Sequence, residues 1–373
     1  MKHAHGGNLR ALAQAAGRSE DDILDFSANI NPLGPPEWLR PIISANVSRL
    51  IHYPDSACAA LIEAAASRYG VDSDEVLAGN GSTELLYLLP RTLNAKRALI
   101  PTPAYIDYAK AANLAGLEVT KIALREDAGF ALDLDKLESQ LREHDVVFLG
   151  QPNNPTGLTC PVKALRALAI RHPAVAFIVD EAFIDFATDI ESMTRQRPAN
   201  VIVLLSLTKI FAVPGLRLGC AIADREIVGR AREIQPPWSV NTIAQAVGIA
   251  GLQDRQYIER TKAFVSDQRQ KLTTALQSFG CLTVYPGQAN FLLIRIDQSE
   301  SQDQNQIGAS ELARLALRDG IAIRVCDNFD GLDDRFFRVA VRTDTENQQL
   351  VAALQKALGL SRDNNAVAQI GGP

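Results

Sequence analysis

The sequence predicts an α/β protein in which helices cover both faces of one large, mostly parallel sheet. Between residues 108 and 237, helical stretches alternate with short apolar runs, for example at residues 174–180 and 201–205. This alternation is typical of βαβ units, whose parallel strands are buried on both faces. Three of these runs lead into polar residues, and the carboxyl ends of parallel strands meet at one edge of a sheet. We therefore expect a functional site at that edge.

The overall composition is that of an ordinary folded protein and excludes several functional classes. Of 373 residues, 47% are hydrophobic and 22% charged, and 38 basic against 43 acidic residues give a net charge of −5. This charge offers no general attraction to nucleic acid or to an anionic membrane. The chain lacks an apolar signal core or a membrane-length apolar run, so we expect a cytoplasmic protein. Its five cysteines lack metal-site or disulfide spacing, and no metal is predicted.

The chain is expected to divide into four parts. Residues 1–50 form an arm, with one short helix at residues 8–16, that contributes to the small domain and to the active site. Residues 51–265 form a large domain and residues 266–360 a small one. Residues 361–373 are expected to be a disordered tail.

The arm begins with His5, followed by Gly6 and Gly7. Two glycines make a flexible hinge, which would let His5 reach a site built elsewhere in the chain. The alternative is a tag-like tip with no role. Asn29 lies further along the arm, and a helix is expected at residues 58–69.

A turn rich in glycine and hydroxyl residues follows a short strand at residue 76. It contains Gly81, Ser82 and Thr83 and leads into an expected helix at residues 84–93. Backbone amides at the start of a helix bind anions, so this turn is a candidate phosphate site. A glycine-rich turn alone is weak support.

Further strands are expected at residues 97–100, 117–122 and 146–150. We assign Tyr105, after the first of them, to core packing. The last runs into a loop with Asn-Pro and Thr-Gly pairs, which favour a fixed turn. In that loop the amide of Asn154 can donate to a phenolate oxygen.

Asp180 ends the next strand, and its carboxylate can hold a pyridine nitrogen protonated. Pyridoxal phosphate needs such a partner to act as an electron sink. Taken alone, the segments that contain Asn154 and Asp180 are each as well explained as a turn at a strand end.

Lys209 follows the apolar run 201–205, between hydroxyl residues. A partly desolvated lysine loses proton affinity and becomes a nucleophilic amine that condenses with an aldehyde. Ser206, Thr208 and Arg217 beside it are suited to bind a phosphate. An isolated lysine here would be a surface residue, but this pattern indicates pyridoxal 5′-phosphate.

The rest of the chain predicts a smaller sheet. Residues 242–277 form a long connecting helix, strands are expected at residues 281–285, 291–296 and 336–341, and residues 297–306 form a loop.

Two arginines occur in apolar surroundings, Arg324 after an apolar run and Arg338 within one. A buried guanidinium is costly unless it meets an anion, and its planar shape suits a carboxylate or a phosphate. Both arginines fit substrate binding. The alternative is a structural salt bridge with Asp333 or Asp334.

Several of these motifs resemble the fold-type I aminotransferase superfamily, and within it the histidinol-phosphate aminotransferase branch. They are Asn-Asn-Pro-Thr-Gly at 153–157, Asp-Glu-Ala-Phe at 180–183, Ser-Leu-Thr-Lys at 206–209 and Gly-Leu-Arg-Leu-Gly at 215–219. Other segments are similar to the threonine-phosphate decarboxylases of cobalamin biosynthesis, namely His-Gly-Gly-Asn at 5–8, the stretch 24–34 and Pro-Trp-Ser-Val-Asn at 237–241. The resemblance covers residues 3–358.

The resemblance implies a fold and a set of roles. The fold is a large domain with a seven-stranded-type sheet and a smaller α+β domain. Tyr108 would stack on the pyridine ring, and Tyr53 would reach across a homodimer interface to the partner's cofactor phosphate. The resemblance implies that the substrate is held by His5, Gly6, Asn29, Asn154, Arg324 and Arg338.

The resemblance also implies a reaction, the decarboxylation of O-phospho-L-threonine to (R)-1-amino-2-propanol phosphate. O-phospho-L-serine is a possible second substrate, because one methyl group is worth only about 1–3 kcal/mol. The bond that breaks is the one held perpendicular to the cofactor ring, and the sequence leaves that angle open. The alternatives are a histidinol-phosphate-type aminotransferase and a catalytically silent module. Phe183, where that branch usually has tyrosine, disfavours the first, and the presence of Lys209 and Asp180 disfavours the second.

Overall fold

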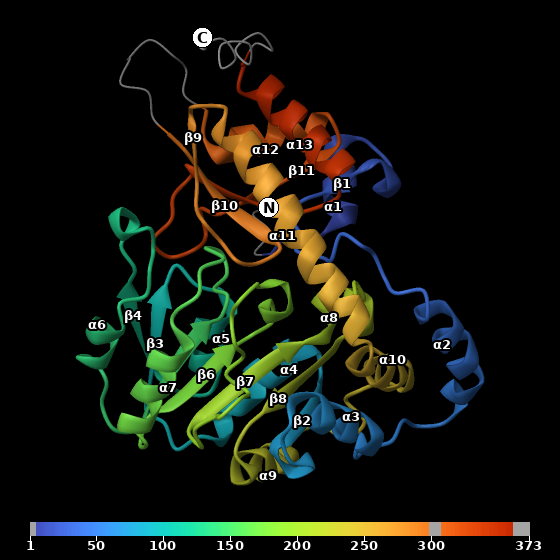
Figure 1. Ribbon diagram of the computed structural model, residues 1–373, viewed down its shortest axis with the longest axis vertical. Helices are drawn as coiled ribbons and strands as arrows, with labels where there is room; N and C mark the ends of the chain where they lie inside the picture. The colour runs from blue at the N-terminus through green and yellow to red at the C-terminus, as the bar shows by residue number, and fades with distance from the viewer. Residues whose placement is uncertain (1–4, 298–306, 361–373) are drawn as a thin grey trace, which may run out of the picture.

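The computed structural model describes residues 5–297 and 307–360. Its centre is a seven-stranded sheet (Figure 1), in which only the pairs made by β8 are antiparallel. The prediction of a mostly parallel sheet is therefore confirmed. The strands run in the order β2 (Val76–Asn80), β8 (Leu218–Ile222), β7 (Val201–Ser206), β6 (Ala176–Asp180), β5 (Asp145–Gly150), β3 (Arg97–Thr102) and β4 (Glu118–Ala123).

Helices pack on both faces of this sheet, as the alternating helical stretches predict. Successive side chains of a strand point to opposite faces, so on β7 Val203 joins one hydrophobic cluster and Leu204 the other. The first face is covered by α3 (Ala59–Tyr69), α7 (Val162–Arg171) and α10 (Thr242–Gln253), and the second by α4 (Gly81–Leu88), α5 (Asp107–Leu114) and α9 (Arg225–Ile234). Both faces of the sheet are buried, so its strands are apolar and could be predicted from apolar runs in the sequence.

A second, antiparallel sheet lies above the first in Figure 1, and α11 (Arg255–Gln277) runs from one toward the other. Its strands are β12 (Arg324–Val325), β13 (Phe336–Ala340), β10 (Phe291–Ile296) and β9 (Leu282–Val284), and α12 (Ala309–Arg318) and α13 (Asp344–Ala357) accompany it. The arm joins this part through a short parallel pair of β1 (Leu24–Asp25) with β11 (Ile321–Ala322). The predicted domain boundaries stay a prediction, and α11 is continuous across residue 265.

The structure corrects three expected elements. The long helix at 242–277 is two helices, broken at Asp254, whose carboxylate accepts hydrogen bonds from the Tyr257 amide and the Trp38 indole. The helix expected at 84–93 begins earlier, as α4, and ends in a 3₁₀ turn that contains Pro90. The arm holds not only α1 (Leu9–Ala16) but also α2 (Leu39–Asn46).

Two short helices complete the α-helices of the described residues, α6 (Leu134–Glu138) and α8 (Leu207–Ile210). The predicted tail at 361–373 and most of the predicted loop at 297–306 lie outside the described residues. Within residues 5–297 and 307–360, no helix has the length and apolar character needed to cross a membrane.

Candidate active site

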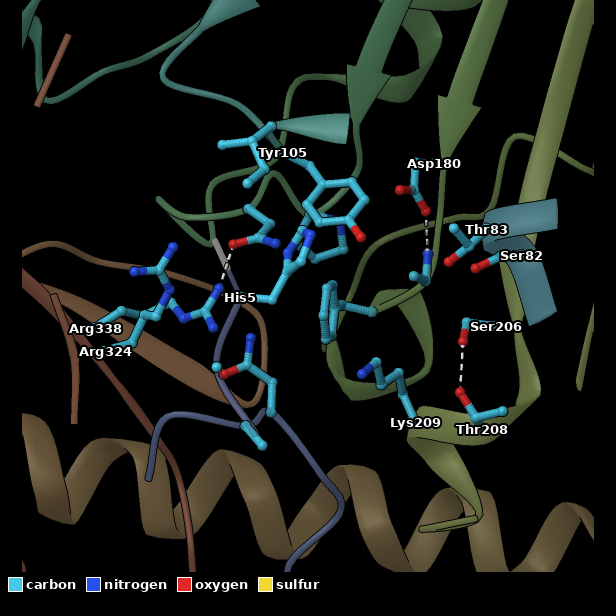
Figure 2. A pocket seen from close by; sticks show the side chains of 18 of the residues that line it. His5, Ser82, Thr83, Tyr105, Asp180, Ser206, Thr208, Lys209, Arg324 and Arg338 are labelled. Carbon is cyan, nitrogen blue, oxygen red and sulfur yellow. Dashed lines mark hydrogen bonds between the residues drawn. The ribbon is translucent and has the colours of Figure 1, made fainter. Parts of the chain in front are cut away.

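The predicted site residues come together at the carboxyl edge of the large sheet. Asp180 is the last residue of β6 and lies opposite Gly150 on β5 and Leu204 on β7, so the segments that follow these three strands are neighbours. One pocket at this edge is lined by every predicted site residue except Gly81 and Tyr53. Figure 2 shows side chains from the large sheet, the arm and the smaller sheet converging there.

A cup suited to a phosphate forms where β2, β8 and β7 meet. On β8, Gly219 pairs with Gly79 of β2 and with Ser206 of β7, and this register brings the start of α4 beside Ser206 and Thr208. The two hydroxyl groups lie 3.0 Å apart. The first turn of α4 adds backbone amides that no residue of the helix can satisfy, which makes it a place for an anion.

Gly81 shapes this cup although it does not line the pocket. Its φ of +78° is left-handed, and a Cβ there would lie 2.6 Å from the guanidinium of Arg217. Only glycine therefore lets Arg217 approach the turn that carries Ser82 and Thr83.

Lys209 lies in α8, one residue beyond the cup. Removal from water lowers the pKa of its amine to about 8, and the positive charges of Arg338 and Arg217 act in the same direction against the opposing effect of Asp180. The predicted loss of proton affinity is therefore present, and a substantial part of the amine is neutral near pH 8.

This pKa predicts how the capture of pyridoxal phosphate by the cofactor-free protein depends on pH. Only the neutral amine attacks an aldehyde, so the rate of capture should rise about tenfold per pH unit below the pKa of about 8 and level off above it. Stopped-flow absorbance measures the rate. In Arg338→Gln the pH at which the rate levels off should be higher, because the loss of a neighbouring cation raises the pKa of Lys209. A rate that does not bend between pH 6 and pH 10 would contradict the assignment.

Asp180 is held at the floor of the pocket by two hydrogen bonds. The Tyr108 hydroxyl donates to Oδ2 at 3.0 Å and the Ala182 amide to Oδ1 at 3.0 Å. Burial raises the pKa of Asp180, whereas the two hydrogen bonds and the charge of Lys209 oppose this rise. The adjacent Glu181 points away from the pocket, toward Ser192.

The residues present fit pyridoxal phosphate. The cup offers backbone amides, hydroxyl groups and Arg217 to its phosphate, Lys209 offers an amine to its aldehyde, and the carboxylate of Asp180 can meet its ring nitrogen. Tyr108, predicted to stack on the ring, is buried in the same wall, packs on Phe148 and holds Asp180. Its stacking role stays a prediction.

Arg338 faces the pocket from the smaller sheet and is 6% exposed. In the described part of the chain its guanidinium bonds to the side-chain oxygen of Asn154 and to the Ser27 carbonyl, at 3.1 Å for the latter, but to no carboxylate. Its Nε has no partner there. The buried cation is thus short of an anion, and the bond to Asn154 leaves the amide nitrogen of Asn154 for a ligand.

The two acids named in the alternative bind other residues. Asp333 pairs with Arg335, with 2.8 Å between Nη2 and Oδ2, and Asp334 binds Ser310 at the start of α12. Arg324 lies beside Arg338 on the facing strand, with its guanidinium 5.3 Å from the centre of the Phe329 ring. Burial lowers the pKa of both arginines.

The arm docks over the pocket. The Gly7 amide donates to the Ser27 hydroxyl at 2.9 Å, and a Cβ on Gly6 would lie 2.2 Å from the Ser27 carbonyl oxygen. Asn29, also in the pocket, is buried with no partner for its Oδ1 among the described residues. The structure therefore places His5 and Gly6 in the pocket, and their contact with a substrate stays a prediction.

Several pocket residues were missed as site residues, among them Ser27, Tyr105, Phe183 and Phe329. Tyr105 was assigned to the core, but it follows β3, whose carboxyl end lies at the same edge as the predicted site. That position was a usable signal. Phe329 had none, because it belongs to an irregular segment between β12 and β13.

Tyr53 lies outside the pocket. It is 79% exposed and stacks on Trp238, with ring centres 4.6 Å apart. Its predicted contact with a cofactor across a dimer interface is not tested within a single chain.

Comparison with known proteins indicates the family of this chain. Residues 21–354 match the family model of aminotransferase class I and II. The chain is 39% identical over 361 residues to a threonine-phosphate decarboxylase of Salmonella typhimurium, covering 95% of this chain and 96% of that one. It is 38% identical over 354 residues to the adenosylcobalamin biosynthesis bifunctional protein CobDQ of Leptospira interrogans, covering 94% of this chain but 40% of that longer protein.

A solved structure, the histidinol-phosphate aminotransferase from Clostridium acetobutylicum, is similar in fold with a TM-score of 0.82 and 30% identity. The similarity covers 91% of this chain and 100% of that chain.

Proposed function

The chain belongs to the aminotransferase class I and II family, and we propose that this pyridoxal-phosphate enzyme decarboxylates O-phospho-L-threonine to (R)-1-amino-2-propanol phosphate for cobalamin synthesis. One observation carries the proposal: anion-binding groups outnumber those that a cofactor and a simple amino acid require. The cup serves one phosphate, whereas Arg338, which bonds to no carboxylate among the described residues, and the docked His5 lie in the pocket beyond it. A substrate with both a carboxylate and a phosphate satisfies them.

Different residues of the chain have different roles in the proposed reaction. When bound, pyridoxal phosphate supplies an electron sink for the electron pair left at the substrate's α-carbon. Asp180 keeps a proton on the ring nitrogen. Lys209, with a pKa of about 8, can hold a proton and return it to the α-carbon. Arg338, short of an anion, binds and orients an acidic group of the substrate.

The relatives support this choice of reaction. Threonine-phosphate decarboxylase is the name of the Salmonella typhimurium relative that matches this chain over nearly its full length. We further propose that O-phospho-L-serine is turned over more slowly, because the loss of one methyl contact costs about 1–3 kcal/mol.

Transamination of histidinol phosphate is the second candidate, favoured by the similarity to the Clostridium acetobutylicum structure. Carboxyl-labelled O-phospho-L-threonine separates the two. Under the proposal the labelled carboxyl group leaves as carbon dioxide while the cofactor's absorbance returns to its starting form. Conversion of the cofactor to pyridoxamine phosphate, without labelled gas, would overturn decarboxylation. Histidinol phosphate serves as the comparison substrate.

We also propose a homodimer with shared active sites. Support comes from large apolar side chains exposed on the segment after α2 and on the turn before α10: Val47, Leu50, Ile51, Tyr53 and Trp238. In one chain these side chains are exposed, although Tyr53 and Trp238 stack on each other, and an apolar patch of this kind is typical of an interface. A cytoplasmic location belongs to the same proposal, since all five cysteines are free.

If Tyr53 completes the partner's site, Tyr53→Ala should weaken the affinity for pyridoxal phosphate by about 10- to 100-fold, because a hydrogen bond to a charged group is worth about 1.5–3 kcal/mol. Fluorescence titration measures the affinity, and sedimentation the mass. Tyr53→Phe is the matched variant that keeps the ring.

A mixture of Tyr53→Ala and Lys209→Ala chains tests whether Tyr53 acts across the interface. If it does, the mixed dimer contains one site with both residues intact, and activity rises above that of either variant. An absence of recovery in demonstrated mixed dimers would place Tyr53 in its own subunit's site or in none.

A further inference from the structure

Asp107, at the start of α5, was absent from the predicted site and does not line the pocket. Its carboxylate nonetheless contacts three side chains around the pocket mouth, one through a hydrogen bond and two as ion pairs. The Tyr105 hydroxyl donates to Oδ2 at 3.0 Å, Nε2 of His5 lies 3.5 Å from the same oxygen, and Nζ of Lys110 lies 3.1 Å from Oδ1. The side chain of Asp107 is 7% exposed.

The carboxylate stays charged in this position. Burial alone would raise the pKa of Asp107, but the hydrogen bonds from His5, Lys110 and Tyr105 outweigh burial and lower the pKa to about 2. Asp107 is therefore an anion throughout the pH range in which a cytoplasmic enzyme works.

Two of the three donors belong to the pocket. His5 and Tyr105 both line it, with ring centres 5.9 Å apart, and Figure 2 shows the imidazole beside the tyrosine ring. The first residues of the arm have a second contact further along the arm, at Ser27, which follows β1 and lies on the side of the smaller sheet. The arm thus crosses the pocket from Ser27 to the start of α5 on the large sheet.

We propose that Asp107 is a positioning residue that anchors the arm across the pocket mouth and orients His5 toward the anionic group of the substrate. The inference rests on the proposed function in one respect, that the ligand is a phosphorylated amino acid. With Nε2 on Asp107, Nδ1 is the nitrogen left for a ligand.

The test is a binding titration of the pyridoxal-phosphate-loaded enzyme, read from the cofactor's absorbance. In Asp107→Asn the dissociation constant for O-phospho-L-threonine should rise about tenfold, because a charge-assisted contact is lost, while that for L-threonine should stay within about twofold. The turnover number should change less than the affinity. Asp127→Asn, an exposed acid paired with Arg125, is the matched control and should match the wild type.

A double-mutant cycle separates orientation of His5 from a general structural role. If Asp107 acts through His5, Asp107→Asn combined with His5→Ala should bind O-phospho-L-threonine no more weakly than His5→Ala alone. Asp107→Glu, which keeps the charge, should recover part of the affinity. Additive losses, or equal losses for phosphorylated and unphosphorylated ligands, would overturn the proposal.

Asp107→Ala is the second variant should the asparagine substitution prevent folding. Because the titration reads binding, it is independent of the reaction that follows. If the wild type binds O-phospho-L-threonine but transaminates it, the proposed decarboxylation fails while the role of Asp107 is still decided by the cycle. If the wild type does not bind O-phospho-L-threonine, the role of Asp107 is overturned as well.

Discussion

Replacement of Lys209 by alanine is expected to lower turnover of O-phospho-L-threonine by at least about 10⁴-fold, since it removes both the nucleophilic amine and a proton carrier at the α-carbon. The fold should persist. The strand before Lys209 is buried without help from the amine, and the cup at Ser206 and Thr208 lies on the backbone that precedes it. Carbon dioxide release measures turnover, and circular dichroism checks the fold.

Two controls test whether the loss of turnover in Lys209→Ala is due to the missing amine. Lys163→Ala removes an exposed lysine on α7 and should leave turnover unchanged. Added methylamine should restore a small part of the lost activity in Lys209→Ala, because a free amine can replace the missing one. Turnover in Lys209→Ala above a tenth of the wild-type value would show that another residue performs the chemistry.

The sequence predicted secondary structure best where the strands are buried. The strand expected at 201–205 is β7, and the strand expected at 291–296 is β10 with the same bounds. A buried strand must be apolar along its whole length, so it stands out, and polar residues just beyond it are confined to the sheet edge. For this reason the amino-acid pattern alone predicts that Asp180 and Lys209 lie together.

Features that depend on contacts between distant parts of the chain were harder to predict from the sequence. The break at Asp254 contains neither proline nor glycine, and it depends partly on the Trp38 indole, far away in the chain. The anchoring of His5 by Asp107 likewise joins segments about a hundred residues apart. Hydrophobic periodicity reports which face of an element is buried, but it does not report which polar groups meet across the fold. The predicted contact of Tyr53 with a partner's cofactor cannot be seen in a single chain, where Tyr53 stacks on Trp238.

The second large effect is expected from Asp180→Asn, which should lower the turnover number about 10³-fold, consistent with about 3–5 kcal/mol for breaking a buried charge pair. Asparagine has the same shape, and its oxygen can still accept from the Ala182 amide. Tyr108, at 3.0 Å from Oδ2, can also stay in place. What is lost is the negative charge that holds a proton on the ring nitrogen of the cofactor, so the electron sink becomes weaker.

The thermal stability of Asp180→Asn should not fall with its turnover number. The folded-state pKa of Asp180 is raised by burial, so its ionised form is disfavoured by folding in the absence of the cofactor. This penalty is present above the ordinary carboxyl pKa and absent below it. At neutral pH the cofactor-free Asp180→Asn protein should therefore melt at the same temperature as the wild type or higher. A lower melting temperature together with lost activity would indicate a structural role instead.

Two comparisons isolate the charge of Asp180. Tyr108→Phe removes one of its hydrogen bonds but keeps the carboxylate, so it should cost about 10- to 100-fold, the value of a single hydrogen bond to a charged group. Reconstitution of Asp180→Asn with N-methylated pyridoxal phosphate supplies a permanent positive charge at the ring nitrogen and should recover part of the turnover. If the methylated cofactor restores nothing while it binds normally, then Asp180 does not act through the ring nitrogen. Recovery in Asp180→Asn, with no gain in the wild type, would establish that the strand end carries a charge partner for the cofactor.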